Sequence, residues 1–396
     1  MSELFWPGDW RAGALFGDRA FVAAMTRVEA GWLRVLRDAG LAPDADPDSL
    51  PEVDGDDVAA GAEAGGNPVI PLVRLLRERL PESTASWLHR GLTSQDVLDS
   101  ALMLCLRDAL DQVLADVRRQ VAALAGLADR YRGAVQAGRT LTQHAVPTTF
   151  GLTAASWLAG VLDAAGDLVA LRAAIPVQVG GAAGTLSAVT EMAGGSAAAG
   201  RLADALASEL GLQPARPWHG NRRPITRAGD ALVAALDAWG RIANDVLVGS
   251  RPEIAELAEP VPGGSSTMPH KQNPVLSVLI RRAALAAPFA TAQLHAAAAA
   301  AVDERPDGAW HAEWTALRTL GRTGATAAAQ TAELLAGLRV DTARMRSTAE
   351  AAGEALLAEA RAMGTNPAAI DDYLGRADEL VDDALARAAA FMEAAP

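Results

Sequence analysis

The sequence predicts an all-α protein built from a bundle of long helices, and two observations support this prediction. Half of the residues are apolar but only 4% are aromatic, and alanine, which has the highest helix propensity, dominates many windows. Apolar residues also recur at every third or fourth position from Leu102 to Tyr131. Their mean step of about 3.6 residues is the helical period. At about 1.5 Å per residue, this segment is expected to form a helix roughly 44 Å long.

Other helices are expected on both sides of this segment. Residues 40–68 are rich in Pro, Asp and Gly and predict loops that interrupt the N-terminal helices. Apolar spacing predicts a helix over 232–246 and a further one over about 311–337. Between these two, a helix is expected to begin at Pro274, with Asn273 as its N-cap.

The order of these elements predicts three consecutive domains. Helical patterning resumes after Leu338 and is broken by GTNPAAIDDYLG at 364–375. We therefore expect a small N-terminal helical domain over 1–95, a central helical bundle over 96–338 and a C-terminal helical domain over 339–396.

The charge balance limits the partners of the chain. It has 48 acidic and 35 basic residues, a formal net charge of -13, and so lacks the basic footprint of nucleic-acid or anionic-membrane binding. An anionic substrate would need a locally positive pocket. The alanine-rich window 283–302 contains Pro288, Gln293 and His295, which is unlike a membrane-spanning segment. We interpret this window as a buried helix of the bundle.

The cysteine content and the N-terminal sequence exclude disulfides, cysteine-rich metal sites and a recognisable secretory signal. Cys105 is the only cysteine, which excludes an intrachain disulfide and the cysteine-rich metal sites. Its place between Leu104 and Leu106 indicates a packing residue rather than a nucleophile. The first residues, MSELFWPGDWRAG, contain no secretory signal, so a cytoplasmic protein is expected.

Two segments carry residues suited to chemistry. The string GGSSTMPHKQNPV, Gly263–Val275, combines a flexible entry, two adjacent hydroxyls, Lys271 and a helix start. This string fits an ordinary loop that ends in a helix cap. It also fits a mobile loop with a proton-transfer group, a cation and backbone donors that can hold a carboxylate. The string TSQD, Thr93–Asp96, fits a capping box, and a hydroxyl-rich helix N-terminus also stabilises an anion.

The first of these segments carries a family resemblance. Its pattern GSS-x-MP-x-K-x-NP resembles the signature loop of the fumarase/aspartase superfamily, and the chain is most similar in pattern to bacterial 3-carboxy-cis,cis-muconate cycloisomerases. The resemblance implies that Ser265 exchanges the carbon-bound proton of the substrate. It also implies that Lys271 and Asn273 hold the adjacent carboxylate, with Ser266 and Met268 as further substrate contacts.

The same resemblance assigns the TSQD segment to carboxylate binding. Thr93 and Ser94 are the residues to which this role is transferred. His89, four residues earlier, falls where some members of the superfamily place an active-site histidine. Alternatively, His89 is a polar surface or hydrogen-bonded packing residue.

A third segment, GRTLTQHAVPTTFG at 138–151, resembles the GxTHxQ region of the superfamily. Thr140 and Gln143 match the pattern, but Leu141 replaces the histidine that many of these lyases use as general acid. His144 lies three residues later and is retained as a candidate contact, not as a replacement. A general acid matters most for poor leaving groups, so Leu141 is compatible with a carboxylate that leaves or adds without protonation.

The resemblance implies a function and an assembly. 3-Carboxy-cis,cis-muconate, a small polycarboxylate, would be cyclised to 4-carboxymuconolactone without a metal ion or organic cofactor. The active sites would be shared by three subunits of a homotetramer. Weaker similarities at 66–73, 177–186, 217–225 and 308–318 agree with this branch.

Two alternatives stay open. The first is a β-elimination lyase of the same superfamily that acts on a nitrosuccinate-like or aspartate-like succinate derivative, and Leu141 permits nitrite loss more readily than amine loss. The second is a non-catalytic relative. An expected shortening of the C-terminal domain before Tyr373–Ala384 favours this second alternative, whereas the intact loop at 263–274 opposes it.

Overall fold

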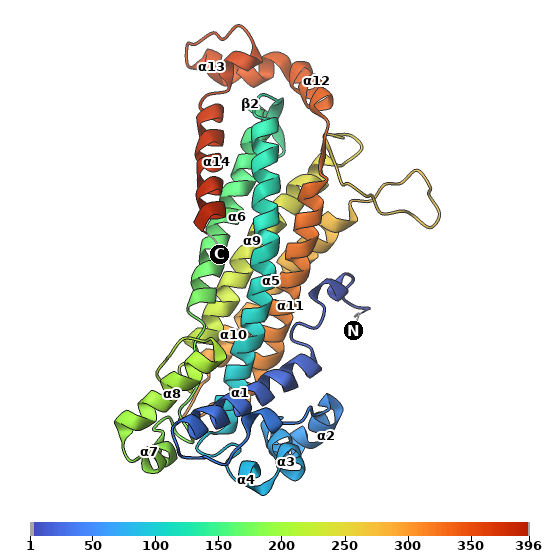
Figure 1. Cartoon of the computed structure of the whole chain (residues 1–396). Helices are drawn as coiled ribbons and strands as arrows, with labels where there is room; N and C mark the ends of the chain where they lie inside the picture. Colours follow the sequence, from blue (N-terminus) through green and yellow to red (C-terminus); the bar gives the residue numbers. More distant parts are fainter. Residues whose placement is uncertain (1–3, 395–396) are drawn as a thin grey trace. The chain divides into compact units, whose positions relative to one another are not determined.

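The computed structural model describes residues 4–394 and confirms the all-α prediction (Figure 1). Within that range, strands form only two antiparallel pairs. Strand β1 (Val135–Thr140) pairs with β2 (Gln143–Thr149), and β3 (Leu257–Ala258) pairs with β4 (Arg339–Val340). Helices therefore provide the framework, and the hairpin β1–β2 carries the GxTHxQ-like segment.

Five long helices form the bundle. They are α5 (Ser94–Arg130), α6 (Phe150–Ala173), α9 (Arg223–Gly249), α10 (Val275–Ala299) and α11 (Gly308–Ala336). Four of them, all except α6, were predicted. Helix α5 begins eight residues before the first position of the apolar pattern and contains 37 residues. It is therefore roughly 56 Å long, and the TSQD segment forms its first turn.

Contacts between residues divide the chain into two compact units, which are described separately. The first unit consists of Met1–Gln112, Val169–Leu232 and Pro288–Ala325, and the second of Val113–Leu168, Val233–Ala287 and Thr326–Pro396. Because each unit is assembled from three separate stretches, the long helices contribute segments to both. The division into three consecutive domains stays a prediction.

In the first unit, short helices surround the start of α5. They are α1 (Asp18–Asp38), α2 (Gly55–Gly65), α3 (Val69–Arg79), α4 (Glu82–Ala85), α7 (Ser187–Ala193) and α8 (Ser196–Leu210). Gly31 of α1 faces α8 so closely that an added Cβ would lie 3.2 Å from the Leu206 side chain. Trp32 and Leu36 of α1 are fully buried.

The prediction of loops over 40–68 is wrong in part, because helix α2 forms there. The Asp54 side chain accepts a hydrogen bond from Asp56 N at 2.9 Å and caps the helix, which is a strong local start signal. The helix ends at Gly65 and is followed by the C-cap Gly66, whose φ of 68° suits glycine. The polar and glycine residues read as loop markers therefore act as helix caps.

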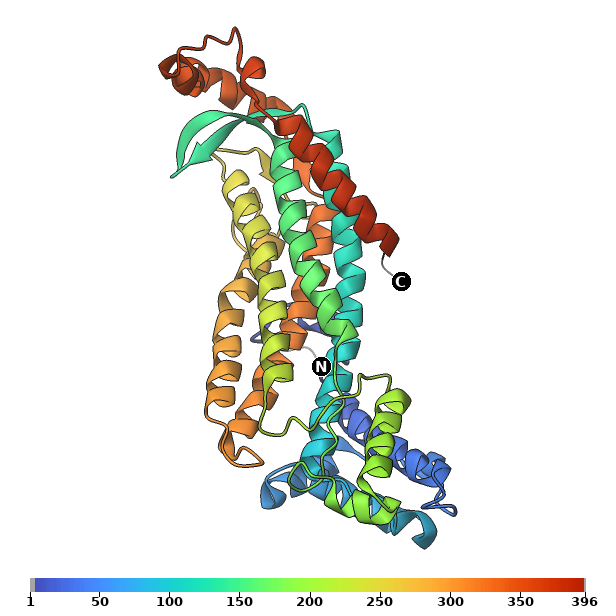
Figure 2. The same cartoon turned by 90° about the vertical axis from the view of Figure 1, so that its left-hand side faces the viewer.

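In the second unit, the hairpin β1–β2 packs on the C-terminal segment (Figure 2). That segment contains α12 (Thr342–Ala352), α13 (Ala358–Ala362) and α14 (Ala377–Ala394), as the sequence pattern predicted. Val135 and Ala137 of β1 share a hydrophobic cluster with Ala349 and Leu356. Burial of this cluster fixes the base of the hairpin and leaves its tip free.

The prediction that 283–302 is a buried helix is wrong for one face of α10. Leu285 is 62% exposed and Phe289 is 78% exposed. By length and composition alone, α6 and α10 could cross a membrane, but 56% of the apolar window of α6 is buried in the protein and only 28% of that of α10. Helix α10 therefore presents an apolar face that this chain does not cover.

Candidate active site

The first turn of α5 carries Thr93, Ser94 and the buried residue Asp96. Thr93 N donates to Asp96 Oδ2 at 3.0 Å, which is one half of the predicted capping box. The other half is replaced, because the Thr93 hydroxyl accepts a hydrogen bond from the Arg305 guanidinium. The helix start is thus capped and also bound to a cation.

Asp96 is fully buried and fixes the segment from behind. Besides Thr93 N, its carboxylate accepts hydrogen bonds from Gly180 N and Gly181 N at 2.9 Å and from Gln178 Nε2 at 3.0 Å. His219 Nε2 lies 3.0 Å from Asp96 Oδ1. With both oxygens occupied, Asp96 positions the turn and holds the 177–186 stretch against it.

A buried ionic network lies one turn further along α5. Arg222 donates to Asp99 at 2.7 Å and to Glu313 at 2.7 Å, and all three side chains are at most 1% exposed. Trp310 Nε1 also donates to Asp99, at 2.9 Å. Burial raises the pKa of Glu313 despite its hydrogen bonds and charge attraction to Arg222, and the neighbouring Asp99 charge adds to the rise.

These contacts involve the weaker family-like stretches, to which sequence analysis assigned no chemical role. Residues 217–225 supply Arg222 and His219, and residues 308–318 supply Glu313 and His311. His311 Nε2 lies 2.8 Å from the carbonyl oxygen of Gly66, at the start of the 66–73 stretch. In this structure these stretches hold the start of α5 in place.

Arg305 is the residue that sequence analysis missed in this region. Within residues 4–394 it forms no ion pair with a carboxylate, and its buried Nε has no hydrogen-bond partner. Arg305 thus supplies the locally positive site that an anionic substrate of this acidic chain would require. A single arginine in the loop between α10 and α11 belongs to no periodic pattern, so only the fold reveals its position.

His89 also lies near the start of α5. Its Nδ1 is 2.6 Å from Glu29 Oε1, and its ring and Ser94 line one cavity of about 420 Å³. The structure therefore brings His89 and Ser94 together, as the sequence grouped them. Burial alone lowers the pKa of His89, but the charge and hydrogen bond of Glu29 outweigh it, so the pKa is raised overall.

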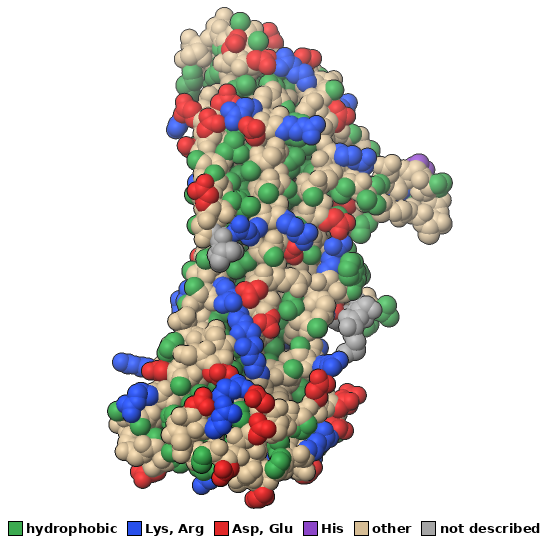
Figure 3. All heavy atoms as spheres, viewed as in Figure 1, with side chains coloured by type: hydrophobic (Ala, Val, Ile, Leu, Met, Phe, Trp, Pro, Cys, Tyr) green, Lys and Arg blue, Asp and Glu red, His purple; other side chains and the backbone are tan. Residues whose placement is uncertain are grey.

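In the second unit, the signature loop projects from the helices (Figures 1 and 3). Paired hydrogen bonds between Gly263 and Asn273, at 2.8 and 2.9 Å, close its base. Ser265 Oγ accepts from Met268 N at 3.2 Å and from Thr267 N at 3.4 Å. The loop therefore directs two backbone donors at the hydroxyl that the resemblance identifies as the proton-transfer group.

The other predicted residues of the loop are open to solvent. Ser266, Met268 and Lys271 are exposed, and Lys271 forms no ion pair within the described part of the chain. The Asn273 side chain donates to Gly264 O at 3.1 Å. Asn273 thus stabilises the base of the loop, and Lys271 remains a free cation.

The N-cap predicted at Asn273 is wrong, because Glu259 caps α10. The buried Glu259 carboxylate accepts from Ser277 N at 2.6 Å and from Leu276 N at 3.0 Å. A carboxylate at a helix N-terminus is favoured by the helix dipole, and here the protein provides its own. The two donors are therefore not available to a substrate, contrary to the sequence-based expectation.

The hairpin β1–β2 brings Thr140 and Gln143 opposite each other at its end. The two residues between them, Leu141 and Thr142, have φ angles of 48° and 71°, a conformation that costs energy for residues with side chains. His144 pairs with Arg139 and, as the neighbour of Gln143 in a strand, points to the opposite face. His144 and Gln143 therefore lie on opposite faces of the hairpin.

The predicted site residues thus form three groups. The groups are the start of α5 (His89, Thr93, Ser94), the hairpin end (Thr140, Gln143, His144) and the signature loop (Ser265, Ser266, Met268, Lys271, Asn273). Each group is held by hydrogen bonds within its own unit.

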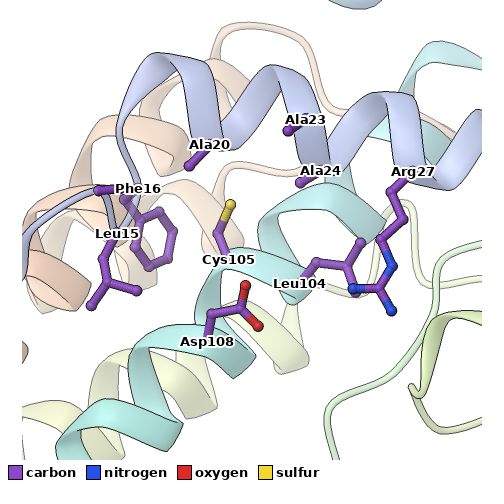
Figure 4. A pocket seen from close by; sticks show the side chains of 10 residues that line it. Leu15, Phe16, Ala20, Ala23, Ala24, Arg27, Leu104, Cys105 and Asp108 are labelled. Carbon is purple, nitrogen blue, oxygen red and sulfur yellow. The ribbon is translucent and has the colours of Figure 1, made fainter. Parts of the chain in front are cut away.

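A metal site and the single cysteine are the other features that could carry chemistry. Residues 4–394 contain no cluster of three or more His, Cys, Asp or Glu side chains that could hold a metal ion. The Cys105 thiol points toward α1 and lines a mainly apolar cavity of about 320 Å³ (Figure 4). Burial raises its pKa to about 12, so Cys105 is a packing residue, as predicted.

Comparisons with known proteins identify the family. A family model described as "Lyase" matches residues 54–287. Nitrosuccinate lyase of Streptomyces davaonensis is 44% identical over 361 residues, which cover 87% of this chain and 76% of that protein. The chain therefore belongs to this lyase family, within the fumarase/aspartase superfamily, and is an enzyme of that superfamily.

Cycloisomerases of the family are also similar to this chain. 3-Carboxy-cis,cis-muconate cycloisomerase of Bradyrhizobium diazoefficiens is 40% identical over 346 residues, or 84% of this chain and 74% of that protein. The crystal structure of 3-carboxy-cis,cis-muconate lactonizing enzyme from Pseudomonas putida matches with a TM-score of 0.85 at 28% identity, covering 96% of this chain and 97% of that one. The comparisons support the suspected relationship and the fold, and leave the reaction open between these activities.

Proposed function

We propose that the chain is a β-elimination lyase that acts on a succinate derivative whose leaving group departs as an anion, with nitrosuccinate as the first candidate. The observation that carries the proposal is Leu141, which is 95% exposed at the hairpin tip. In many lyases of the family this position holds the general acid. Nitrite is a stable anion and leaves without protonation, whereas hydroxide and amines need a proton donor. The 44% identity with a nitrosuccinate lyase supports this choice.

In this mechanism Ser265 removes a proton from the carbon next to a substrate carboxylate. The hydroxyl first transfers its own proton to a water molecule of the solvent to which the loop is open, and the N–H groups of Thr267 and Met268 stabilise the resulting oxyanion. The electron pair left on carbon is delocalised into the carboxylate, where the Lys271 cation stabilises it. The pair then forms the carbon–carbon double bond as the carbon–nitrogen bond breaks, giving fumarate and nitrite.

The second carboxylate of the substrate is assigned to the start of α5. Thr93 and Ser94 lie at the positive end of a 37-residue helix. Arg305, bound to the Thr93 hydroxyl, adds a full positive charge and an unpaired buried Nε. A bidentate arginine–carboxylate contact would satisfy this group.

We also propose a homotetramer with active sites shared by three subunits. Supporting this, Val278, Leu285 and Phe289 of α10 are 51%, 62% and 78% exposed. Large exposed apolar side chains that recur on one face of a helix are typical of a protein interface. Light scattering at the elution peak of a gel-filtration column tests the assembly, and a stable active monomer would contradict it.

Cycloisomerisation of 3-carboxy-cis,cis-muconate is the second candidate. The TM-score of 0.85 with a muconate lactonizing enzyme favours it, and an intramolecular carboxylate likewise needs no general acid. The test is incubation of the purified protein with each substrate and identification of the products by NMR. Fumarate with equimolar nitrite supports the elimination, whereas a lactone without released nitrite supports the second candidate.

A further inference from the structure

A fully buried carboxylate lies behind His89. Glu29 of α1 is 0% exposed, and its Oε1 is 2.6 Å from His89 Nδ1. Within residues 4–394 its second oxygen, Oε2, has no hydrogen-bond partner. Burial of a carboxylate with one unsatisfied oxygen is unfavourable for stability. The pair is therefore hard to explain as packing alone.

The backbone around His89 is strained and held on both sides. His89 has a φ of 61°, a left-handed conformation that is unfavourable for a residue with a side chain. Leu88 O accepts a hydrogen bond from Arg77 at 2.7 Å, and Arg90 O accepts one from Trp32 Nε1 at 2.8 Å. Two backbone contacts and the Glu29 side chain thus fix the ring in one orientation.

The His89 side chain lines the cavity of about 420 Å³ at the start of α5. His89 is 19% exposed in its side chain, and Nε2 has no partner among the described residues. The lining of the cavity also includes Arg74, Arg77, Glu78 and Ser94. Ser94 places it at the positive end of α5, where an anionic group is favoured.

We propose that Glu29 is a positioning residue that keeps His89 as a cationic hydrogen-bond donor, with Nε2–H directed into this cavity toward an anionic oxygen of the substrate. The inference deepens the proposed function and rests on it. His89 thereby contacts the substrate, whereas Glu29 acts only through His89. A cation that binds the substrate or the departing anion supplies electrostatic stabilisation in a chain that lacks a histidine at 141.

The charges around His89 set the pH range of this contact. Glu29 and Asp96 favour the protonated ring, and Arg77 opposes it. Arg74 lies in the same cavity but pairs with Glu78 at 2.8 Å. Because the pKa of His89 is raised, the cation is present at low pH and is lost as the pH rises through the raised pKa.

The test is an NMR titration of the whole protein with labelled histidine, with and without succinate as the probe. The pKa of His89 should fall in Glu29→Gln, and succinate should shift the His89 resonance in the unmodified protein. Asp230→Asn is the matched control, because Asp230 lies 2.8 Å from His295 in an exposed pair. This variant should leave the His89 titration unchanged. An unchanged His89 titration in folded Glu29→Gln overturns the inference.

His89→Asn is the second variant, because Asn tolerates a positive φ and cannot titrate in this range. It should weaken succinate binding at neutral pH about tenfold, the loss of one charge-assisted hydrogen bond. In steady-state kinetics, the alkaline limb of kcat/KM should move to lower pH in Glu29→Gln and disappear in His89→Asn. Succinate binding equal to that of the unmodified protein contradicts the inference.

The two proposals fail in different ways. If neither nitrosuccinate nor the muconate is converted, the titration and the succinate measurement still test the Glu29–His89 pair, since neither needs turnover. If turnover occurs but His89 responds to neither Glu29→Gln nor succinate, the pair has no role at the substrate and the elimination proposal stands.

Discussion

Replacement of Asp96 by Asn should strongly destabilise the protein. Thr93 N and Gly181 N donate to Oδ2, while Gln178 Nε2 and Gly180 N donate to Oδ1. In Asp96→Asn one oxygen becomes an NH2 group, so at least two buried donors face another donor. At about 1.5–3 kcal/mol for each hydrogen bond to a charged group, the loss is about 3–6 kcal/mol. This is a large fraction of the roughly 5–15 kcal/mol that stabilises a typical domain.

The assay is urea unfolding monitored by circular dichroism at a fixed protein concentration, because assembly affects the midpoint. Asp129→Asn is the matched control on the same helix, since Asp129 is exposed and pairs with Arg132 at 3.2 Å. Its effect should be within about 0.5 kcal/mol. A destabilisation below about 1 kcal/mol in Asp96→Asn would refute the assignment of Asp96 as the anchor of this turn.

Three further predictions concern other parts of the chain. Leu141→Asn with Thr142→Gly should raise the free energy of unfolding by about 1–2 kcal/mol, because Asn-Gly suits a two-residue turn with positive φ; an unchanged melting temperature would contradict this. Arg305→Met should lower kcat/KM about 10- to 100-fold by loss of carboxylate binding, whereas Arg251→Met, exposed in another loop, should have no effect. With a pKa of about 12, the Cys105 thiolate fraction at pH 8 is about one in ten thousand, so intact-mass spectrometry should detect negligible alkylation by iodoacetamide in the native protein.

Local sequence patterns predicted four of the five long helices and the motif-bearing segments, but not α6 or α2. The apolar period over 102–131 predicted most of α5, because a long amphipathic helix repeats its pattern many times. The capping signal at Thr93–Asp96 was also correct in half of its hydrogen bonds, since it depends on residues three positions apart. An error arose at α2 because residues that cap this helix, such as Asp54, were interpreted as loop residues.

The residues that sequence analysis missed act through contacts between distant segments. Arg305 contacts Thr93 across 212 positions, and Glu29 contacts His89 across 60. Glu259 caps α10 from 17 or 18 positions away and displaces Asn273 from that role. No local period or spacing encodes such pairs, so they become visible only when the fold brings the segments together.

The central claim is that Ser265 removes a proton and an anionic group leaves without a general acid. The most direct test is the rate of nitrite and fumarate release from nitrosuccinate by the unmodified protein and by Ser265→Ala. Gln272→Ala, an exposed change in the same loop, is the control. We predict equimolar nitrite and fumarate, a loss of about 10²–10⁴-fold in Ser265→Ala and no loss in the control. Nitrite release that is equally fast in Ser265→Ala would contradict the claim.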